Sequence, residues 1–259
     1  MAYEYARRGA CLVLVDIRED GLGRVVDKAR QLGSPDAIAV QADVSNAQDC
    51  KRFIEATVDH FGRLDHLVNN AGTYKASLFV EVDHISAYPP VMDTNFWGTV
   101  FGTHYAVPHL RNSKGKIIVI ASIAGWYPIP RISTYNASKA ALIIYYETLR
   151  TEIGRDVGIT IVTPGVINTE MIQSSSAFKV GLDAFPMESA EECAKAIVKS
   201  ACRSDKYLVE PSWVRVLYLF KVFCPEIVEY FNRWVFNTRP ETKMKFNGIS
   251  SQPLDQKAD

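Results

Sequence analysis

The chain has 259 residues, 47% of them hydrophobic, and its 29 lysines and arginines equal its 29 aspartates and glutamates. This composition is sufficient for one large α/β domain or two small ones, and the balanced charge gives no reason to expect a nucleic-acid partner. Five scattered cysteines without a Cys-x-x-Cys pair argue against a metal site or a disulfide framework and indicate free thiols in a reducing compartment.

Apolar runs alternate with amphipathic segments, which is typical of a parallel sheet covered by helices on both faces. The pattern predicts strands at 11–15, 37–41, 64–68, 116–121, 159–163 and 207–209. It predicts helices at 2–8, 19–32, 47–61, 85–110, 134–153 and 190–201. The serine-rich segment 170–187 shows no clear period and is predicted to be a mobile loop.

Targeting signals are not evident. No stretch reaches the roughly 18 apolar residues of a membrane span, and residues 1–5 do not resemble a signal peptide. The chain by itself is therefore expected to be soluble and cytoplasmic.

Tyr135 and Lys139 are the first candidate catalytic pair, because a spacing of four places both on one face of the helix at 134–153. A free tyrosine titrates near pH 10, and a nearby ammonium group favours the phenolate and lowers that pKa. Such a tyrosine can act as a general acid or base. The spacing alone is weak, since surface helices often show it.

Two strand ends strengthen this interpretation. Ser122 follows the strand at 116–121, where ligands bind in open parallel sheets, and its hydroxyl could orient a substrate oxygen. The run Asn69-Asn70-Ala71-Gly72 follows another strand. Together these features argue against the interpretation that Tyr135 and Lys139 are only a chance pair on a surface helix.

The combined motifs resemble the short-chain dehydrogenase/reductase family. They are Asp43-Val44, Asn69-Asn70-Ala71-Gly72, Asn95, Ser122, the Tyr135-to-Lys139 run and Pro164-Gly165-Val166-Ile167-Asn168-Thr169. The resemblance covers roughly residues 2–207 and implies a Rossmann-like doubly wound parallel sheet of strand order 3-2-1-4-5-6-7. It also implies an NAD(P)-dependent enzyme that interconverts a secondary alcohol and a ketone.

The resemblance implies a catalytic role for each of four residues. Tyr135 would exchange the proton, and Ser122 would orient the substrate oxygen. Lys139 would hold the nicotinamide ribose and lower the tyrosine pKa, and Asn95 would support a proton-relay water. The alternative is that Asn95 has no catalytic role and is an ordinary polar residue on a helix.

Cofactor contacts are implied by the same resemblance. Asp43 would accept from the adenine amine and Val44 would pack on its ring, although Asp43 could be a plain turn residue. The strand-end run would contact the cofactor through Asn69, Ala71 and Gly72, although Asn69 could equally brace the structure. The run from Pro164 to Thr169 would contact the cofactor through Pro164, Gly165, Ile167 and Thr169.

Asp16 bears on the choice between NAD and NADP. A carboxylate at the end of this strand can accept from the ribose 2′-hydroxyl and would repel a 2′-phosphate, which favours NAD. Arg18 could still bind a phosphate and moderate that repulsion. Asp16 could also cap the helix at 19–32.

One family feature is not found in the chain. The Thr-Gly-x-x-x-Gly-x-Gly turn, which presents a helix N-terminus to the pyrophosphate, occurs nowhere. Residues 1–9 match the back half of the helix that should follow it, so we expect a Rossmann-type domain at 1–210 that lacks its first, central strand. Either the sequence is a fragment of an enzyme, or it is a short product that has become a non-catalytic lipid-surface or scaffold protein.

The C-terminal part, 211–259, is expected to hold an amphipathic helix and a polar tail disordered from about Gly248. Within the family, residues 205–234 resemble the plant 11-beta-hydroxysteroid dehydrogenase-like proteins, or steroleosins. That implies a sterol-like or other lipophilic substrate and a location on the cytosolic face of a membrane or lipid droplet, although the N-terminal anchor of those proteins is lacking. Met171, Ile172, Phe178 and Phe185 also suggest a lipophilic substrate.

The segment Trp213 to Phe223 is apolar nearly all round, with cationic and aromatic residues beside leucine and valine. Such a helix suits a peripheral membrane surface. The alternative is a helix that packs on the body of the protein or on a second subunit of a homodimer.

Overall fold

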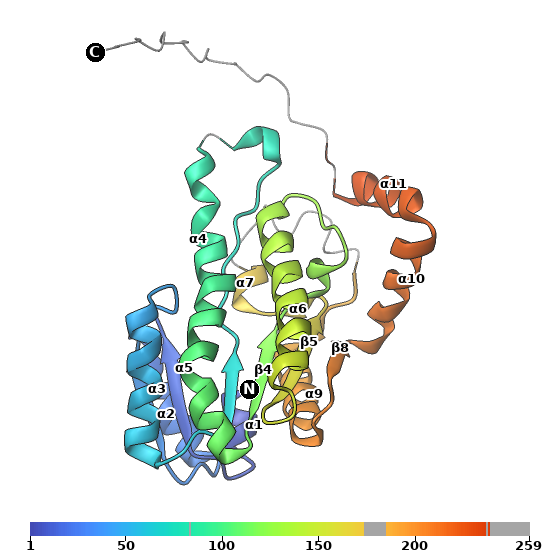
Figure 1. Ribbon diagram of the computed structural model, residues 1–259. Helices are drawn as coiled ribbons and strands as arrows, with labels where there is room; N and C mark the ends of the chain where they lie inside the picture. The colour runs from blue at the N-terminus through green and yellow to red at the C-terminus, as the bar shows by residue number, and fades with distance from the viewer. Residues whose placement is uncertain (83, 174–184, 237, 239–259) are drawn as a thin grey trace, which may run out of the picture.

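The computed structural model describes residues 1–82, 84–173, 185–236 and 238 (Figure 1). Its strands are β1 (Leu12–Asp16), β2 (Ala37–Gln41), β3 (His66–Asn69), β4 (Lys116–Ile120), β5 (Gly158–Pro164), β6 (Ile167–Asn168), β7 (Glu188–Ser189) and β8 (Tyr207–Glu210). The helices before β5 are α1 (Ala2–Ala6), α2 (Leu22–Gln31), α3 (Ala47–Phe61), α4 (Pro89–Met92), α5 (Gly98–Ser113) and α6 (Ser133–Ile153). Those after it are α7 (Glu170–Gln173), α9 (Ala190–Arg203), α10 (Arg215–Phe223) and α11 (Pro225–Val235).

The strands pair in parallel in the orders β1-β2, β3-β4-β5-β8 and β6-β7. Alternate residues of β4 face opposite layers: Ile117 packs in the cluster with α3, α5 and α6, and Ile118 packs in the cluster with α9. Helices therefore cover both faces of the larger sheet (Figure 1). This confirms the expected Rossmann-like, doubly wound architecture.

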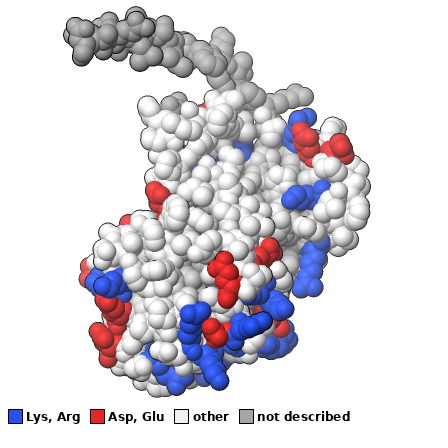
Figure 2. Space-filling model, in the orientation of Figure 1, with Lys and Arg blue, Asp and Glu red and all other residues white. Residues whose placement is uncertain are grey.

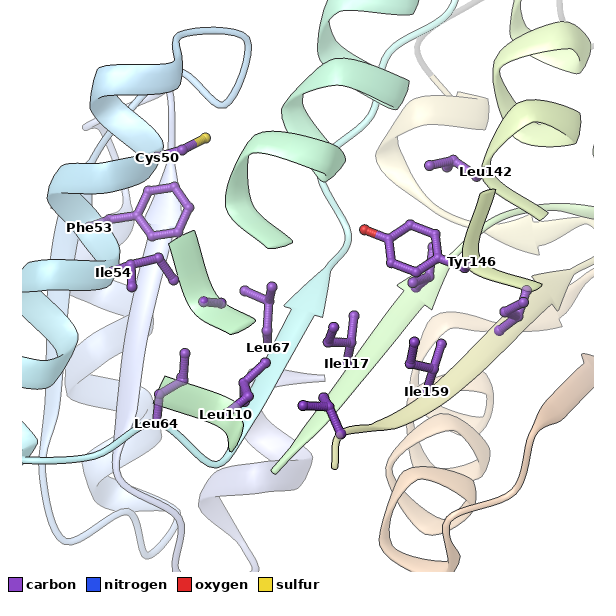
Figure 3. Close-up of a cluster of buried hydrophobic side chains, with 14 of the residues drawn as sticks. Cys50, Phe53, Ile54, Leu64, Leu67, Leu110, Ile117, Leu142, Tyr146 and Ile159 are labelled. Atoms are coloured by element: carbon purple, nitrogen blue, oxygen red, sulfur yellow. The ribbon is translucent and has the colours of Figure 1, made fainter. Parts of the chain in front are cut away.

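Figure 3 shows the larger core between α3, α5, α6 and the sheet. Phe53 and Ile54 on α3 pack with Leu67 on β3, and Tyr146 on α6 is fully buried in the same cluster. This apolar layer supports α6, and α6 carries Tyr135 and Lys139.

The two main sheets remain separate in the described part of the chain, because β1 pairs only with β2 and β3 only with β4. This break lies where the family order places its first strand. The short helix α1 spans it: Ala6 is buried against α2 and β2, and the Tyr5 hydroxyl lies 2.9 Å from His66 Nδ1 on β3. Met1 packs against the cluster around Ile118.

The predicted helix at 85–110 is divided in the structure. A 3₁₀ turn, η2 (Ile85–Ala87), precedes α4, and a π-helical turn, η3 (Asp93–Trp97), separates α4 from α5. The remaining 3₁₀ turns are η1 (Phe79–Glu81), η4 (Ile123–Gly125) and η6 (Ser212–Val214).

The segment predicted as a mobile loop, 170–187, contains α7 and leads into β7. Phe178 lies outside the described residues, as do Gly248 and the predicted polar tail. Ile172 is buried against Phe236, and Phe185 stacks on that same ring, so these two side chains pack near the end of α11. No helix within the described residues is long and apolar enough to cross a membrane.

Candidate active site

Ser122 stands just beyond the carboxyl end of β4, where the backbone is still extended. Its side chain accepts from the Ala124 N–H at 3.1 Å and so caps the 3₁₀ turn η4. The residue is buried, with 8% of its surface exposed. The serine hydroxyl is thereby fixed at the sheet edge where the sequence predicted it.

Tyr135 and Lys139 lie in the first turns of α6 and face the same site. Lys139 Nζ donates to the Ile120 carbonyl at the end of β4 over 2.8 Å and lies 5.6 Å from the centre of the Tyr135 ring. The lysine is almost completely buried. The structure therefore brings Ser122, Tyr135 and Lys139 together around the end of one strand.

Asn95 occupies the π-helical turn η3 and is fully buried. Its Oδ1 accepts from the Thr73 N–H at 2.7 Å, and its Nδ2 donates to the Thr73 carbonyl at 2.9 Å. Nδ2 also donates to Ser138 Oγ at 2.9 Å, and that hydroxyl donates to the Tyr135 carbonyl. Asn95 thus joins the segment after β3 to the helix of Tyr135, and π turns of this kind often occur at functional sites.

The sequence interpretation did not assign roles to Thr73 and Ser138. Ser138 stands next to Lys139 within the motif, so its position was visible, but nothing in the sequence indicated a partner 43 residues away. Thr73 contributes only its backbone, for which no sequence signal exists.

The pKa values of the pair are set mainly by burial. Burial raises the pKa of Tyr135, and a hydrogen bond with the Ser122 side chain partly offsets that rise. Burial also lowers the pKa of Lys139 to about 8. A net lowering of the Tyr135 pKa is therefore not found, because loss of water around the phenol is the largest effect.

In the run from Asn69 to Gly72, some residues have structural contacts and others lie next to the candidate active site. Asn69 Nδ2 donates to Thr103 Oγ1 at 3.0 Å and to the Tyr146 hydroxyl at 3.2 Å, which favours the structural alternative for Asn69. Ala71 is exposed. A Cβ atom on Gly72 would lie 3.3 Å from Asn95 Oδ1 and 3.7 Å from Lys139 Nζ, so glycine lets the backbone approach the asparagine and the lysine closely.

Asp16 lies at the carboxyl end of β1, and its carboxylate accepts from the Arg18 N–H at 2.8 Å. Arg18 also forms ion pairs with Asp16 at 3.4 Å and with Glu170 at 3.6 Å, linking the end of β1 to α7. The suggestion that Asp16 caps the following helix was wrong, because α2 begins only at Leu22, after Gly21.

Asp43 follows β2, and its Oδ1 accepts from both the N–H and the hydroxyl of Ser45, at 2.9 and 2.8 Å. This local turn favours the plain structural alternative for Asp43. Val44 lies against Gly98, where a Cβ atom would be only 2.8 Å from Val44 Cγ2. Close packing on the start of α5 therefore sets the position of Val44.

The remaining predicted contacts follow β5. Pro164 ends that strand, and the Gly165 N–H donates to the Glu210 carbonyl at 2.7 Å. Ile167 is buried in the cluster on the α9 face of the sheet, whereas Thr169 is half-buried before α7. Of these two residues, only Thr169 leaves part of its surface accessible.

A dinucleotide fits the chemistry of this sheet edge. Asp16, Gly72, Ser122 and Gly165 all follow carboxyl ends of parallel strands, where such ligands bind in open α/β sheets. Gly72 brings the backbone after β3 close to Lys139, on the side where the ribose and nicotinamide end would lie. The chain contains no glycine-rich turn of the family type for the pyrophosphate.

Other cavities lie elsewhere. A groove of about 580 Å³ is bordered by Tyr88, Met92, Trp97 and Thr134, on the outer side of α4 and α6, and Ser122, Tyr135 and Lys139 do not line it. No group of metal-ligating side chains occurs within the residues that the structure describes.

Removal of the Asn95 side chain is expected to destabilise the fold. In Asn95→Ala, Thr73 and Ser138 lose buried partners, which should lower the free energy of unfolding by about 1–3 kcal/mol. Chemical denaturation measures this, with Asn112→Ala on the exposed side of α5 as control, which should stay within about 0.5 kcal/mol of wild type. Equal losses in the two variants would contradict the network.

Comparison with known proteins gives a family match over most of the chain. Residues 1–180 match the family model described as short chain dehydrogenase. The 11-beta-hydroxysteroid dehydrogenase A of Arachis hypogaea is 49% identical, with 98% of this chain and 76% of that protein aligned. The 11-beta-hydroxysteroid dehydrogenase-like 6 of Arabidopsis thaliana is 48% identical, with 98% and 78% aligned.

Solved structures agree in fold. An NADH-dependent reductase, A1-R′, responsible for alginate metabolism is 27% identical, with a TM-score of 0.69 over 80% of this chain and 88% of that one. A short chain dehydrogenase/reductase from Burkholderia phymatum in complex with NAD is 24% identical, with a TM-score of 0.77 over 87% and 89%. The second likeness concerns the fold alone.

Proposed function

The chain belongs to the short-chain dehydrogenase family, whose members are NAD(P)-dependent oxidoreductases, and on that premise we propose that it interconverts a secondary alcohol and a ketone on a steroid-like or other lipophilic substrate. The observation that carries the proposal is the convergence of Ser122, Tyr135 and Lys139 at the end of β4. The names of the plant relatives support the substrate class.

The proposed roles follow from the contacts. The Ser122 hydroxyl holds the substrate oxygen beside the Tyr135 hydroxyl. Because burial raises the pKa of Tyr135, its phenol is protonated at neutral pH and can donate a proton to a ketone oxygen. In the opposite direction, the Lys139 ammonium stabilises the phenolate that accepts the alcohol proton.

Lys139 and Thr169 would hold the ribose and nicotinamide end of the cofactor, and Asp16 the adenosine ribose. The nicotinamide supplies or accepts the hydride when it is bound. Asn95 acts as a positioning residue, because it fixes Thr73 and Ser138 on either side of the site.

NAD is the preferred cofactor in this proposal. Asp16 places a carboxylate where a 2′-phosphate would be repelled. Arg18 is already engaged by Asp16 and by Glu170, which weakens its attraction for a phosphate.

Calorimetric titration of the whole chain with NADH and with NADPH tests the proposal. NADH is expected to bind more tightly, and Asp16→Ala is expected to reduce the preference about tenfold, since a hydrogen bond to a charged group contributes about 1.5–3 kcal/mol. Turnover of a steroid alcohol should exceed that of a small secondary alcohol. Absence of binding by a folded chain would rule out the enzyme proposal for this form.

The second candidate is a non-catalytic lipid-surface or scaffold protein. It is favoured by the break between β1 and β3, because dinucleotides bind across the middle of such sheets. The same titration separates the two candidates.

A homodimer and a location on the cytosolic face of a membrane or lipid droplet complete the proposal. The exposed side chains of Trp97 on η3 and Ile144 on α6 support a dimer, beside a groove bordered by Phe96 and Tyr145.

A further inference from the structure

The helix α10 has no buried residue, although most of its side chains are apolar. Phe223 is 77% exposed, and Val216, Leu219 and Val222 are all more than half exposed. Its contact with the body of the protein is limited: Tyr218 packs edge-on against Trp126, and much of the apolar surface of the helix remains exposed. A helix with this composition needs a partner outside its own chain.

The helix α11 extends the same surface while its inner side is firmly attached. Asn232 is buried; its Nδ2 donates to the Pro128 carbonyl at 2.7 Å, and its Oδ1 accepts from the Tyr127 hydroxyl at 3.2 Å. The outer side exposes Tyr230 at 76% and Trp234 at 74%. Attachment on one side leaves these aromatic rings projecting outward.

We name this surface the α10–α11 patch. Its exposed members are Trp213, Val216, Tyr218, Leu219, Phe220, Val222, Phe223, Ile227, Tyr230, Phe231 and Trp234. The two helices run along one side of the molecule, at the right of Figure 1. On the face shown in Figure 2, charged side chains gather over the lower part, and a smaller mixed group of Lys/Arg and Asp/Glu lies at the right, on the side of α10 and α11.

The charges within the patch select its partner. Helix α10 carries Arg215 and Lys221 and no acidic residue, and neither cation takes part in an ion pair among the described residues. In α11, by contrast, Arg233 is paired with Glu229. Unpaired cations beside tryptophan, tyrosine and aliphatic side chains complement anionic lipid headgroups above an acyl layer.

A second copy of the chain fits less well. A two-fold interface places the same surface on both partners. The cations of α10 would then face a helix without acidic residues, and only Glu226 near the start of α11 carries an unpaired negative charge within the patch.

We propose that the α10–α11 patch docks on an anionic phospholipid surface. The patch is independent of the proposed oxidoreductase activity, so either inference can fail alone. Because Asn232 is bonded to the loop between Ser122 and Tyr135, docking would hold the active-site loop close to the lipid.

Co-sedimentation of the whole chain with vesicles tests this proposal. Vesicles of phosphatidylcholine with about one-third phosphatidylserine are compared with phosphatidylcholine alone. Wild type should bind the anionic vesicles more strongly, and raised salt should weaken that binding. The variant Phe223→Ser with Trp234→Ser should bind at least about tenfold more weakly, as should Arg215→Glu with Lys221→Glu.

The control is Phe79→Ser in η1, an apolar side chain that is 72% exposed and lies outside the patch, which should bind like wild type. The variants change side chains that are exposed or, at Lys221, half-buried, and they should keep the melting temperature of wild type, which establishes that they fold. Undiminished binding by either double variant overturns the proposal. A second result would also overturn it: wild type does not bind the vesicles, light scattering shows a dimer, and Phe223→Ser with Trp234→Ser dissociates that dimer. The patch would then be assigned to contact with a second copy of the chain.

Discussion

Tyr135→Phe is expected to lower the turnover number by about 10²–10⁴-fold, the usual contribution of a positioned acid or base. The change removes only the hydroxyl, so the ring keeps its place beside Lys139. The affinity for NADH should therefore be nearly unchanged, whereas the proton that the ketone oxygen needs has no donor. Steady-state kinetics together with cofactor titration separate these two effects.

The matched control is Tyr145→Phe on the same helix. Tyr145 is also a half-buried phenol whose pKa is raised by burial, and it packs edge-on against Phe96 away from Ser122. Its loss should leave turnover close to wild type. Turnover close to wild type in both variants would contradict the role assigned to Tyr135. A similar large loss of turnover in both variants would indicate damage to α6 in general.

Lys139→Met is expected to stabilise the protein at neutral pH while it abolishes activity. Lowering the lysine pKa from 10.5 to about 8 corresponds to about 3 kcal/mol of unfavourable burial of the charged form. The methionine has a similar shape and no charge. The substitution also removes the hydrogen bond that the ammonium group donates to the Ile120 carbonyl, which offsets about 1.5–3 kcal/mol, so a net gain of at most about 1.5 kcal/mol is expected.

The sign of the pH dependence follows from that lowered pKa. Between pH 8 and 10.5 the unfolded lysine binds more protons than the folded one, so wild-type stability rises with pH relative to the variant. The advantage of Lys139→Met is complete below pH 8 and is lost by about pH 10.5. Tyrosine and cysteine titrations are common to both proteins and cancel in the difference.

Urea unfolding of both proteins at pH 7, 8, 9 and 10 measures this difference. Lys199→Met, on the exposed side of α9, serves as the control, because its ammonium group stays in water in either state. A difference between wild type and Lys139→Met that does not change with pH would contradict the buried, strained lysine.

Local patterns predicted most elements because their causes are local. The prediction of 37–41 and 47–61 agrees with β2 and α3 at both ends, where a short apolar run and the left-handed Gly62 mark the limits. The prediction failed where distant contacts decide the backbone. At Asn95 a π turn interrupts the long helix, and the asparagine bonds Thr73 and Ser138, neither of which is near it in the chain.

Site prediction shows the same division. Motif and spacing predicted Ser122, Tyr135, Lys139 and Asn95 as site residues. The structure places the first three around the end of β4 and joins Asn95 to the helix of Tyr135 through Ser138. Asp43 and Asn69 matched the motif equally well, yet their side chains are bonded to Ser45 and to Thr103 and Tyr146. A motif states which residue type stands at a position, but not which atoms its polar groups contact.

By itself the sequence determined the layered α/β architecture and the family of NAD(P)-dependent oxidoreductases, because hydrophobic period and motif spacing are properties of neighbouring residues. Only the tertiary structure decided the pKa directions of Tyr135 and Lys139, the separation of β1 from β3 and the exposure of α10. Desolvation, strand pairing and exposure depend on which distant atoms surround a group, and that arrangement exists only once the chain has folded.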